Sequence, residues 1–308
     1  MSEPRPTFLL TFDTELFWGL FFLPEFADRE AEMAEVRPAL ASILRILGER
    51  EIRATFAVVG RLFLAGPDDV DEAALPRPDG EAPGGDWYAR VPPPGDPRAP
   101  AWWGRDVVDA IRAAPGRPAA AGHEIAGHGF GHADFDRFDA VRATAEVRAT
   151  VDAAVRAGCP APRSWVFPRN RVAHEAALAV NGIRVWRDAP APRSRARRFL
   201  DQLVAGGPLV ASPRPSPLGL VIAPPGVALL PADGMRRLLT RARRRALYRA
   251  GIERALAESA TFHVWTHPHN FVRRRDVMLG TLEDLADAVA AARDRDGLRV
   301  ATMGDLAP

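Results

Sequence analysis

The sequence contains no lysine, because all 41 of its basic residues are arginine. This absence excludes a lysine-based phosphate loop, a Schiff-base enzyme and any catalytic lysine. A single cysteine, Cys159, excludes an intrachain disulfide framework and a multi-cysteine zinc site. Because residues 157–160 are typical of a helix end followed by a turn, we interpret Cys159 as a structural residue.

Two further absences concern location and mechanism. No stretch approaches the roughly 20 apolar residues that are needed to span a bilayer, and no basic segment leads into an apolar core at the N-terminus. We therefore expect no signal peptide and a cytoplasmic protein. No Gly-x-Ser-x-Gly motif occurs, which excludes a serine hydrolase of that type.

The composition is that of a globular protein. The chain has 308 residues, of which 47% are hydrophobic and 26% are charged, so wholesale disorder is excluded. This length suits one large α/β barrel or two ordinary domains. The formal net charge is only +2 and no zinc finger or aromatic RNA-binding motif is present, so we expect no nucleic-acid partner.

Compact apolar runs alternate with segments of helical periodicity along the chain. Residues 7–12 and 54–59 have the composition of buried strands, and residues 31–50 repeat apolar side chains at helical spacing. This alternation predicts a parallel sheet or barrel. Further strands are expected at residues 164–167, 182–186, 220–223, 261–265 and 299–302, and further helices at residues 106–113, 140–157, 175–181, 234–259 and 282–293.

Residues 66–122 interrupt the alternation with a stretch rich in Pro and Gly. An insertion of this length without its own core is usually functional or disordered. Its aromatic residues favour order, and they can either stack on a sugar ring or pin the loop to the body of the protein. They are Trp87, Tyr88, Trp102 and Trp103. Residues 188–217, rich in Arg, Pro and Ser, are expected to form a long surface connection.

The first cluster with chemical potential follows the first strand and contains Asp13 and Glu15. Carboxylates at positions i and i+2 project on the same side of an extended chain. At the end of a buried strand, one of them can bind a metal while the other acts as a base. The alternative is that both are ordinary acidic residues at a strand-to-loop turn.

Three of the seven histidines fall in the second cluster, residues 122–132. His128 and His132 are four residues apart, and a helical turn would place both imidazoles on one face, a common metal-chelating arrangement. The alternative is a glycine-rich loop with incidental surface histidines. Two histidines and one carboxylate from the first cluster would make the three-ligand set of a catalytic metal site, with open positions for water and substrate.

The third cluster, residues 261–270, begins as a strand, so Trp265 and His267 should share a face. A histidine at a strand end near a metal can protonate a leaving group. The alternative is that these histidines are structural, above all His263.

These motifs together resemble the polysaccharide deacetylases of carbohydrate esterase family 4, which include chitin and peptidoglycan deacetylases. The resemblance rests on Thr-Phe-Asp-x-acid at residues 11–15, Ala-Thr-Phe-x-Val-x-Gly at 54–60, Gly-His-Glu-Ile-x-x-His-x-x-x-His at 122–132 and a late strand ending in His267. It extends from residue 7 to about residue 305. It implies an α/β fold, a distorted (β/α) barrel with about seven strands, as a single domain over residues 1–308 with its metal site at the strand C-termini.

The resemblance also implies roles for individual residues. Asp13 matches the general base of the family. Glu15 takes the place of the metal-binding acid, which is commonly Asp in the family and is here separated from the base by Thr14. His128 and His132 match the two metal-binding histidines. The implied cofactor is a divalent metal, with Zn²⁺ as the default.

The same pattern implies residues around the substrate. Arg169 lies where the family has an arginine-containing motif that walls the groove, although here the Arg follows Pro168 instead of preceding it. Residues 186–188 match the fourth motif loosely. Trp265 matches the pocket for the acetyl methyl and His267 the catalytic acid, with His269 as a competitor for the acid role. Trp102 and Trp103 of the insertion are further candidates for substrate binding.

The implied activity is metal-dependent removal of an N-acetyl group from an amino sugar. A cytoplasmic location favours a nucleotide-linked or lipid-linked sugar, a precursor of a polysaccharide or glycoconjugate. The arginine-rich residues 236–254 could lie against an anionic membrane or a pyrophosphate, or form a solvated helix face. The alternatives for function are a deformylase, an amidase acting on a non-sugar, and a catalytically inactive carbohydrate-binding relative. The oligomeric state is left open.

Overall fold

The computed structural model describes residues 5–66, 69, 76, 86–114, 122–190, 210–229, 231–232 and 234–307. Large parts of two regions singled out in the sequence lie outside the described residues. These are residues 67–68, 70–75, 77–85 and 115–121 of the expected insertion and residues 191–209 of the expected surface connection.

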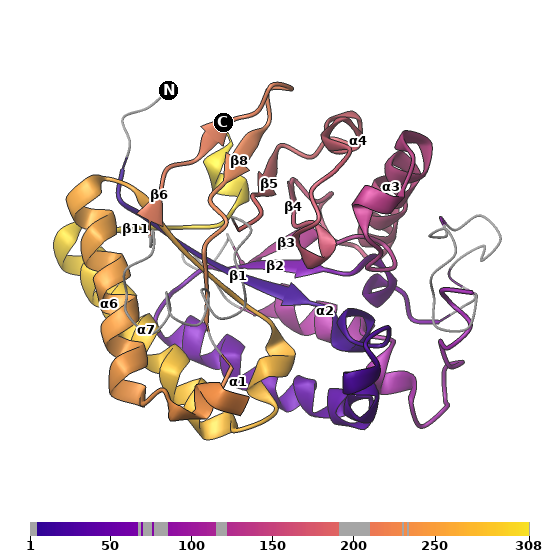
Figure 1. The fold of residues 1–308 in the computed structure, drawn as a ribbon, viewed down its shortest axis with the longest axis horizontal. Coiled ribbons are helices and arrows are strands. Elements are labelled where there is room, and N and C mark those ends of the chain that lie inside the picture. The colour runs from indigo at the N-terminus through magenta and orange to yellow at the C-terminus, as the bar shows by residue number, and fades with distance from the viewer. Residues whose placement is uncertain are drawn as a thin grey trace.

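Seven parallel strands form the centre of one curled sheet (Figure 1). Their order is β10-β1-β2-β3-β4-β5-β8, and every neighbouring pair in this run is parallel. Parallel strands need crossover connections, which place helices against the sheet. The expected α/β fold, a distorted barrel with about seven strands, is confirmed. The strands are β1 (Thr7–Thr14), β2 (Thr55–Val58), β3 (Glu124–Gly127), β4 (Ser164–Trp165), β5 (Val185–Arg187), β8 (Val221–Ala223) and β10 (Thr261–Thr266).

Short strands extend this central run. β7 pairs with β8 and β6 pairs with β10, both antiparallel, while β9 adds to β10 and β11 to β1 in parallel. β1 is buried along its whole length, as expected for the apolar run at the middle of a parallel sheet. The residues at its carboxyl end are therefore buried inside the molecule. The additional strands are β6 (Val210–Ala211), β7 (Arg214–Pro215), β9 (Val227–Ala228) and β11 (Arg299–Ala301).

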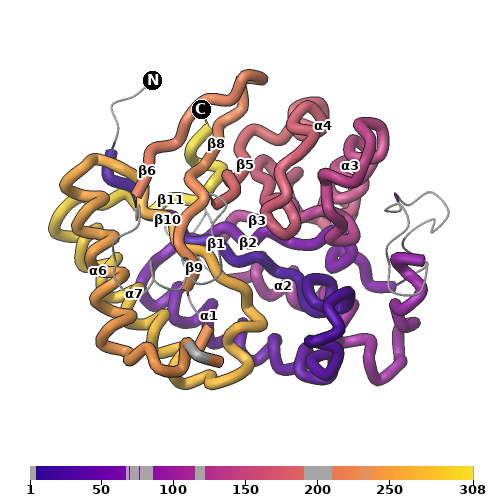
Figure 2. Tube along the Cα trace, in the orientation of Figure 1, coloured from indigo at the N-terminus to yellow at the C-terminus, as the bar shows by residue number. Residues whose placement is uncertain are grey.

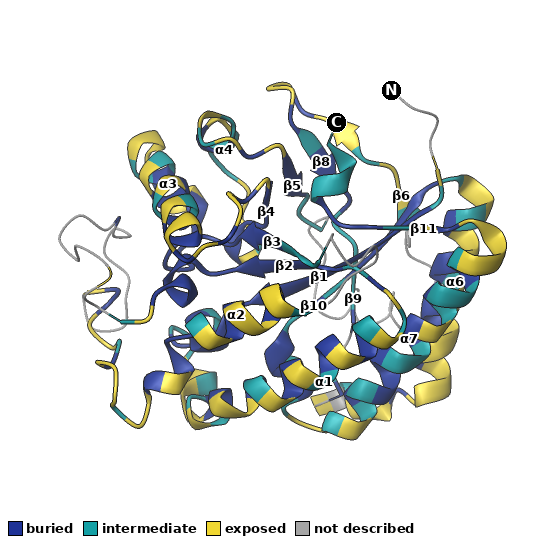
Figure 3. Cartoon of the chain, turned by 180° about the vertical axis from the view of Figure 1, so that it is seen from behind, coloured by how far each residue is buried: buried dark blue, intermediate teal, exposed yellow. Residues whose placement is uncertain are grey.

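The helices bury one face against the rest of the protein and expose the other (Figure 3), and the buried side chains are mostly apolar. α6 packs against α7, and α7 against α1, along one side of the molecule (Figure 2). Local signals set several ends: the carboxylate of Asp139 accepts a hydrogen bond from the backbone N–H of Arg142 at the start of α3, and Gly297 with φ 73° ends α7. The helices are α1 (Val36–Glu49), α2 (Arg105–Ala113), α3 (Ala140–Arg156), α4 (Glu175–Val180), α6 (Arg241–Glu258) and α7 (Arg275–Asp296).

The expected helix over residues 234–259 is divided in two. A 3-10 turn (Gly234–Leu238) comes first, and α6 begins only after Thr240, whose hydroxyl accepts a hydrogen bond from the backbone N–H of Arg243. Periodicity did not reveal the division, because the N-cap lies within an arginine-rich stretch with few apolar residues.

The aromatic residues of the insertion are part of the core. Trp102 is 1% exposed and Trp103 is 7% exposed, and their indole N–H groups donate to Glu30 and to the carbonyl of Pro92. The guanidinium of Arg61 lies 5.2 Å from the Trp103 ring centre, in a group of aromatic rings. This burial leaves no free ring face for a sugar, so it supports the interpretation that the two indoles pin the insertion to the body.

Gly127 at the end of β3 provides a test of this packing. A Cβ at this position would lie 2.3 Å from atoms of the buried Trp165 ring, and overpacking of this kind typically costs about 1–3 kcal/mol. We expect Gly127→Ala to lower the free energy of unfolding by that amount in urea denaturation. Gly122→Ala is the control, since its nearest neighbour would be 3.6 Å away. Equal destabilisation in the two variants would contradict the packing argument.

Candidate metal and acid-base site

The polar residues predicted from three distant motifs meet at one end of the sheet. Asp13 lies near the end of β1 and Glu15 directly follows it, while His128 and His267 directly follow β3 and β10. Arg187 is the last residue of β5. The strands are parallel, so their carboxyl ends lie at the same edge, which is where barrel enzymes place their active sites.

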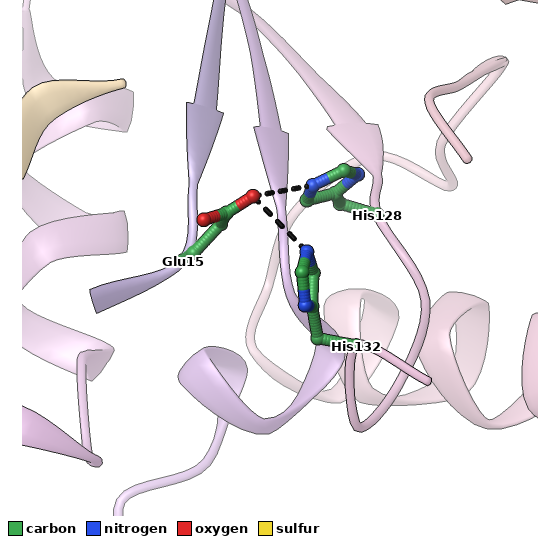
Figure 4. A group of neighbouring side chains, drawn as sticks. All are labelled: Glu15, His128 and His132. Carbon is green, nitrogen blue, oxygen red and sulfur yellow. Dashed lines mark hydrogen bonds and ion pairs between the residues drawn. The ribbon is translucent and has the colours of Figure 1, made fainter. Parts of the chain in front are cut away.

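One oxygen of Glu15 faces two imidazoles (Figure 4). Glu15 Oε1 is 2.9 Å from His128 Nε2 and 3.0 Å from His132 Nε2. All three residues are buried, and together they form a group that could hold a metal ion. The three residues predicted as ligands are therefore brought together by the fold.

The histidines reach Glu15 by a route that differs from the expected helical turn. β3 ends at Gly127, His128 is the first residue beyond it, and the chain then loops until His132. Gly129 and His132 have positive φ angles of 73° and 59°. Alternating glycines disfavour a helix, and a left-handed loop curls the second imidazole back toward the first.

A buried carboxylate that the sequence analysis did not single out supports this loop. Glu146 of α3 is fully buried, and its Oε1 accepts hydrogen bonds from the backbone N–H groups of Phe130 (2.7 Å) and Gly131 (3.0 Å). The indole N–H of Trp87 donates to the carbonyl of Gly131 at 2.7 Å. The same peptide region is thus held from both sides, between the two histidines. Glu146 lies on the face of α3 that is otherwise buried, next to Ala143 and Val147. A charged residue at such a position was the sequence signal that could have identified it.

Asp13 forms a buried ion pair with Arg187. The two guanidinium nitrogens donate to the two carboxylate oxygens at 2.8 and 2.7 Å, and both side chains are nearly inaccessible to solvent. Sequence reasoning placed Arg187 in a loosely matching motif without a role. The one feature that could have identified Arg187 is its place as the last residue of a buried strand.

A further hydrogen-bond chain orients Arg187. Its Nη1 also lies 3.3 Å from the hydroxyl of Thr11, which is 3.1 Å from Nε2 of His263. His263 Nδ1 faces the carbonyl of Pro224 at 2.7 Å, so it carries the proton and Nε2 accepts from Thr11. Burial, together with the nearby Arg187, lowers the pKa of His263 to about 3. His263 is a neutral structural histidine, as one alternative held.

The surroundings keep both carboxylates ionised. Burial would raise the pKa of Asp13, but the charge and hydrogen bonds of Arg187 outweigh it and the pKa is lowered. Burial likewise opposes ionisation of Glu15, yet the histidines around it, led by His267 and His132, hold its pKa well below the usual range. Asp13 is thus an ionised carboxylate tied to a cation, whereas Glu15 faces imidazoles.

His267 and His269 form a stacked pair beside the carboxylates. Their ring centres are 4.7 Å apart, and His267 Nε2 is 3.5 Å from Glu15 Oε1. Burial opposes protonation of His267, but Glu15 and Asp13 prevail and raise its pKa. For His269, burial and the neighbouring His267 lower the pKa to about 3. The two candidates for the acid role therefore differ: only His267 is set up to carry a proton.

Two of the residues predicted to bind substrate, Trp265 and Arg169, keep some exposure. Trp265 is half-buried, and its ring lies 5.2 Å from the guanidinium of Arg187. Arg169 pairs with Asp134 at 2.7 Å and lies 4.1 Å above the ring of Phe22. Arg169 therefore contacts Asp134 and Phe22, whereas the arginine paired with Asp13 is Arg187.

The arginines of α6 are largely engaged within the protein. Arg241 pairs with Asp284 of α7, Arg254 pairs with Glu258, and the buried Arg244 donates to backbone carbonyls, among them that of Arg236. Contact with an anionic membrane stays a prediction. Among the residues that the structure describes, no helix is both long and apolar enough to cross a bilayer.

Comparison with solved structures identifies the fold. A protein assigned as a polysaccharide deacetylase from Mycobacterium smegmatis has a TM-score of 0.63 at 18% identity, over 99% of this chain and 90% of its own. A second protein assigned as a polysaccharide deacetylase, from Pseudomonas aeruginosa PAO1, has a TM-score of 0.60 at 12% identity, and the match covers 98% of this chain and 92% of its own. The allantoinase PuuE has a TM-score of 0.61 at 12% identity, and the match covers 99% of this chain and 90% of the allantoinase. The chain therefore has the fold that polysaccharide deacetylases share with this allantoinase.

Sequence comparisons add no closer assignment. Profiles of known protein families give no match, and no curated protein sequence matches significantly.

The buried Glu146 gives a testable pH dependence. Burial, opposed by its two backbone hydrogen bonds, raises its pKa to about 7, whereas an unfolded Glu titrates near about 4.3. The folded state therefore binds this proton more tightly, and stability from this group falls as pH rises from about 4.3 to about 7. Relative to Glu146→Gln, which keeps the acceptor oxygen, the wild type should lose a few kcal/mol between pH 5 and pH 8. Urea unfolding of both proteins measures this, and a difference that does not vary with pH would contradict it.

Proposed function

We propose that the protein is a metal-dependent hydrolase that removes the N-acetyl group from an amino sugar. The observation that carries the proposal is Glu15 facing His128 and His132 beside an ionised Asp13 and a proton-bearing His267. These are the parts that amide hydrolysis requires: a place for a Lewis acid, a base and a proton donor. The single cysteine is buried, so thiol chemistry is not a competitor.

The donor set fits a divalent metal. The carbonyl of Val166 lies 2.8 Å from His128 Nδ1 and can only accept, so Nδ1 carries a proton and Nε2 is the nitrogen directed at Glu15 Oε1. Imidazole nitrogens and a carboxylate oxygen converging in this way are the donors that a divalent metal ion prefers. Glu15, His128 and His132 would hold it, and two histidines with one carboxylate suit Zn²⁺ most directly. When bound, such an ion polarises an amide carbonyl and lowers the pKa of a water molecule.

Asp13 is the general base in this proposal. It is ionised, and its bidentate pair with Arg187 fixes the carboxylate plane while leaving lone pairs that can accept a proton from the attacking water. Arg187 lowers the pKa of Asp13, so the carboxylate is ionised and ready to accept a proton, although it is a weaker base than a free carboxylate.

His267 is the proton donor to the departing amine. Its raised pKa keeps the proton available near neutral pH, and its partial exposure lets a substrate reach it. His269, with a pKa of about 3, is neutral and stacks behind it. Trp265 and the Phe22–Arg169 pair offer apolar and planar surfaces for the acyl methyl and a sugar ring. Because the wild-type chain carries both base and donor, we disfavour an inactive binding protein.

A second candidate is hydrolysis of another C–N bond, in a formylated amino sugar or a non-sugar amide. It is favoured by the equal structural likeness to the allantoinase. We place the deacetylase first because the metal-ligand spacing and the order of motifs along the chain follow that group. The proposed substrate is a nucleotide-linked, lipid-linked or oligomeric N-acetyl sugar in the cytoplasm, and any membrane contact is peripheral.

Metal content tests the site directly. We expect close to one zinc or other transition-metal ion per wild-type chain, and loss of that ion in His128→Ala and His132→Ala, because each variant removes one of three ligands. Elemental analysis of the purified proteins gives the content, with His174→Gln as a control histidine outside the site. A wild type that stays metal-free after reconstitution would refute the hydrolytic mechanism.

Replacing the base tests the assignment of Asp13. Asp13→Asn cannot take a proton, so we expect kcat to fall by about 10²–10⁴-fold while metal content is retained. Thermal unfolding must accompany the assay, because the variant also removes the charge that compensates the buried Arg187. A folded, metal-loaded Asn variant with a near-normal rate would show that another group is the base.

The released acid separates the candidate reactions. Incubation of the metal-loaded protein with N-acetyl and N-formyl amino sugars, and with allantoin, should release acetate from the first class only. Formate as the main product, or ring opening of allantoin, would assign the chain to the second candidate.

A further inference from the structure

Glu15 is shared between two groups of metal-ligating side chains. The first is the group with His128 and His132. The second combines Glu15 with His267 and His269, and it too places one ligand atom of each residue within 4.8 Å of the others. Four imidazoles from two distant segments thus surround one buried carboxylate.

His269 has no assigned task in the mechanism. It is 5% exposed, and its Nδ1 is buried with no hydrogen-bond partner among the described residues. An unpaired buried polar atom costs folding free energy, so such atoms usually mark a function or an absent ligand. The His269 ring stacks on the His267 ring at an interplanar angle of 21°, so the two rings lie face to face. Imidazole nitrogens with a carboxylate are the donors that zinc and similar ions prefer.

We propose that Glu15, His267 and His269 form a second divalent-cation site, and that its occupation inhibits the enzyme. The inhibition rests on the proposed function. A metal on Nε2 of His267 occupies the nitrogen lone pair that must hold a proton for the leaving amine, so metal binding and proton donation at this atom exclude each other.

The second site is weaker than the first for electrostatic reasons. One carboxylate serves both ions, and two dications repel each other. Arg187 lies near His267 and Arg29 near His269, and both are positively charged. Asn270 Nδ2 is 3.4 Å from His267 Nδ1, and a metal on Nε2 requires the amide to turn so that its oxygen accepts from Nδ1–H. We therefore expect sequential filling, with the second ion bound only when zinc is in excess.

Binding stoichiometry tests the site without any substrate. Metal-free full-length protein is dialysed to equilibrium against increasing free Zn²⁺, and bound zinc is counted per chain. The wild type and the control His174→Gln should rise from one ion to two, whereas His269→Ala and His269→Gln should stop at one. A wild type that saturates at one ion, or His269 variants that still bind two, would overturn the proposal.

Activity tests the inhibition separately. In the wild type, the rate should fall by at least tenfold as the second ion binds, and the ratio of rates at low and high zinc should stay near one in His269→Gln. A wild-type rate that is unchanged while two ions are bound would refute the inhibitory role. Two bound ions with no hydrolysis of any substrate would support the second site and reject the proposed function. Hydrolysis by a protein that never binds more than one ion would support the proposed function and reject the second site.

Discussion

The site depends on a single buried carboxylate surrounded by nitrogen. Glu15 lies at the end of a fully buried strand, and its ionised form is stabilised by imidazoles instead of by solvent. Desolvation opposes the charge of a carboxylate buried in this way, so its ionised form depends on the groups around it. The packing around the loop that carries His128 and His132 can be understood as the means of keeping both imidazoles directed at Glu15.

Two neighbouring acids are given different tasks by their partners. Asp13 is two residues from Glu15, yet it meets a guanidinium in a bidentate pair, with Thr11 and His263 fixing that guanidinium. Arginine cannot lose its proton, so Asp13 stays ionised and oriented, and it remains separate from the metal ligands. The two carboxylates therefore differ in their surroundings, through contacts from segments far apart in the sequence, and this difference is the basis on which we propose Glu15 as a ligand and Asp13 as a base.

The support of the site extends well beyond the residues that meet substrate. Glu146 and Trp87 hold the Gly131 peptide from opposite sides, and the aromatic cluster that includes Trp103 encloses Arg61 next to the same loop. The insertion thus acts as a structural brace for the loop between His128 and His132. This explains why rings that look like sugar platforms in the sequence are buried in the structure, and why the half-exposed surfaces come from Phe22, Arg169 and Trp265 instead.

The sequence by itself predicted the strand and helix alternation, the (β/α) barrel class and the candidate site residues, because apolar periodicity and the spacing of Asp13, Glu15, His128 and His132 are local properties. It misjudged the helical turn for the histidines and left open whether Trp102 pins the insertion or meets a sugar, since loop curvature and burial depend on what packs against them. Only the tertiary structure decided that Arg187 pairs with Asp13, that Glu146 braces the loop, and that His267 and His269 stand beside Glu15. Arg187 and Asp13, like His267 and Glu15, lie more than a hundred residues apart in the sequence, and Glu146 reaches the loop from the following helix. No local pattern records which side chains the barrel will bring together.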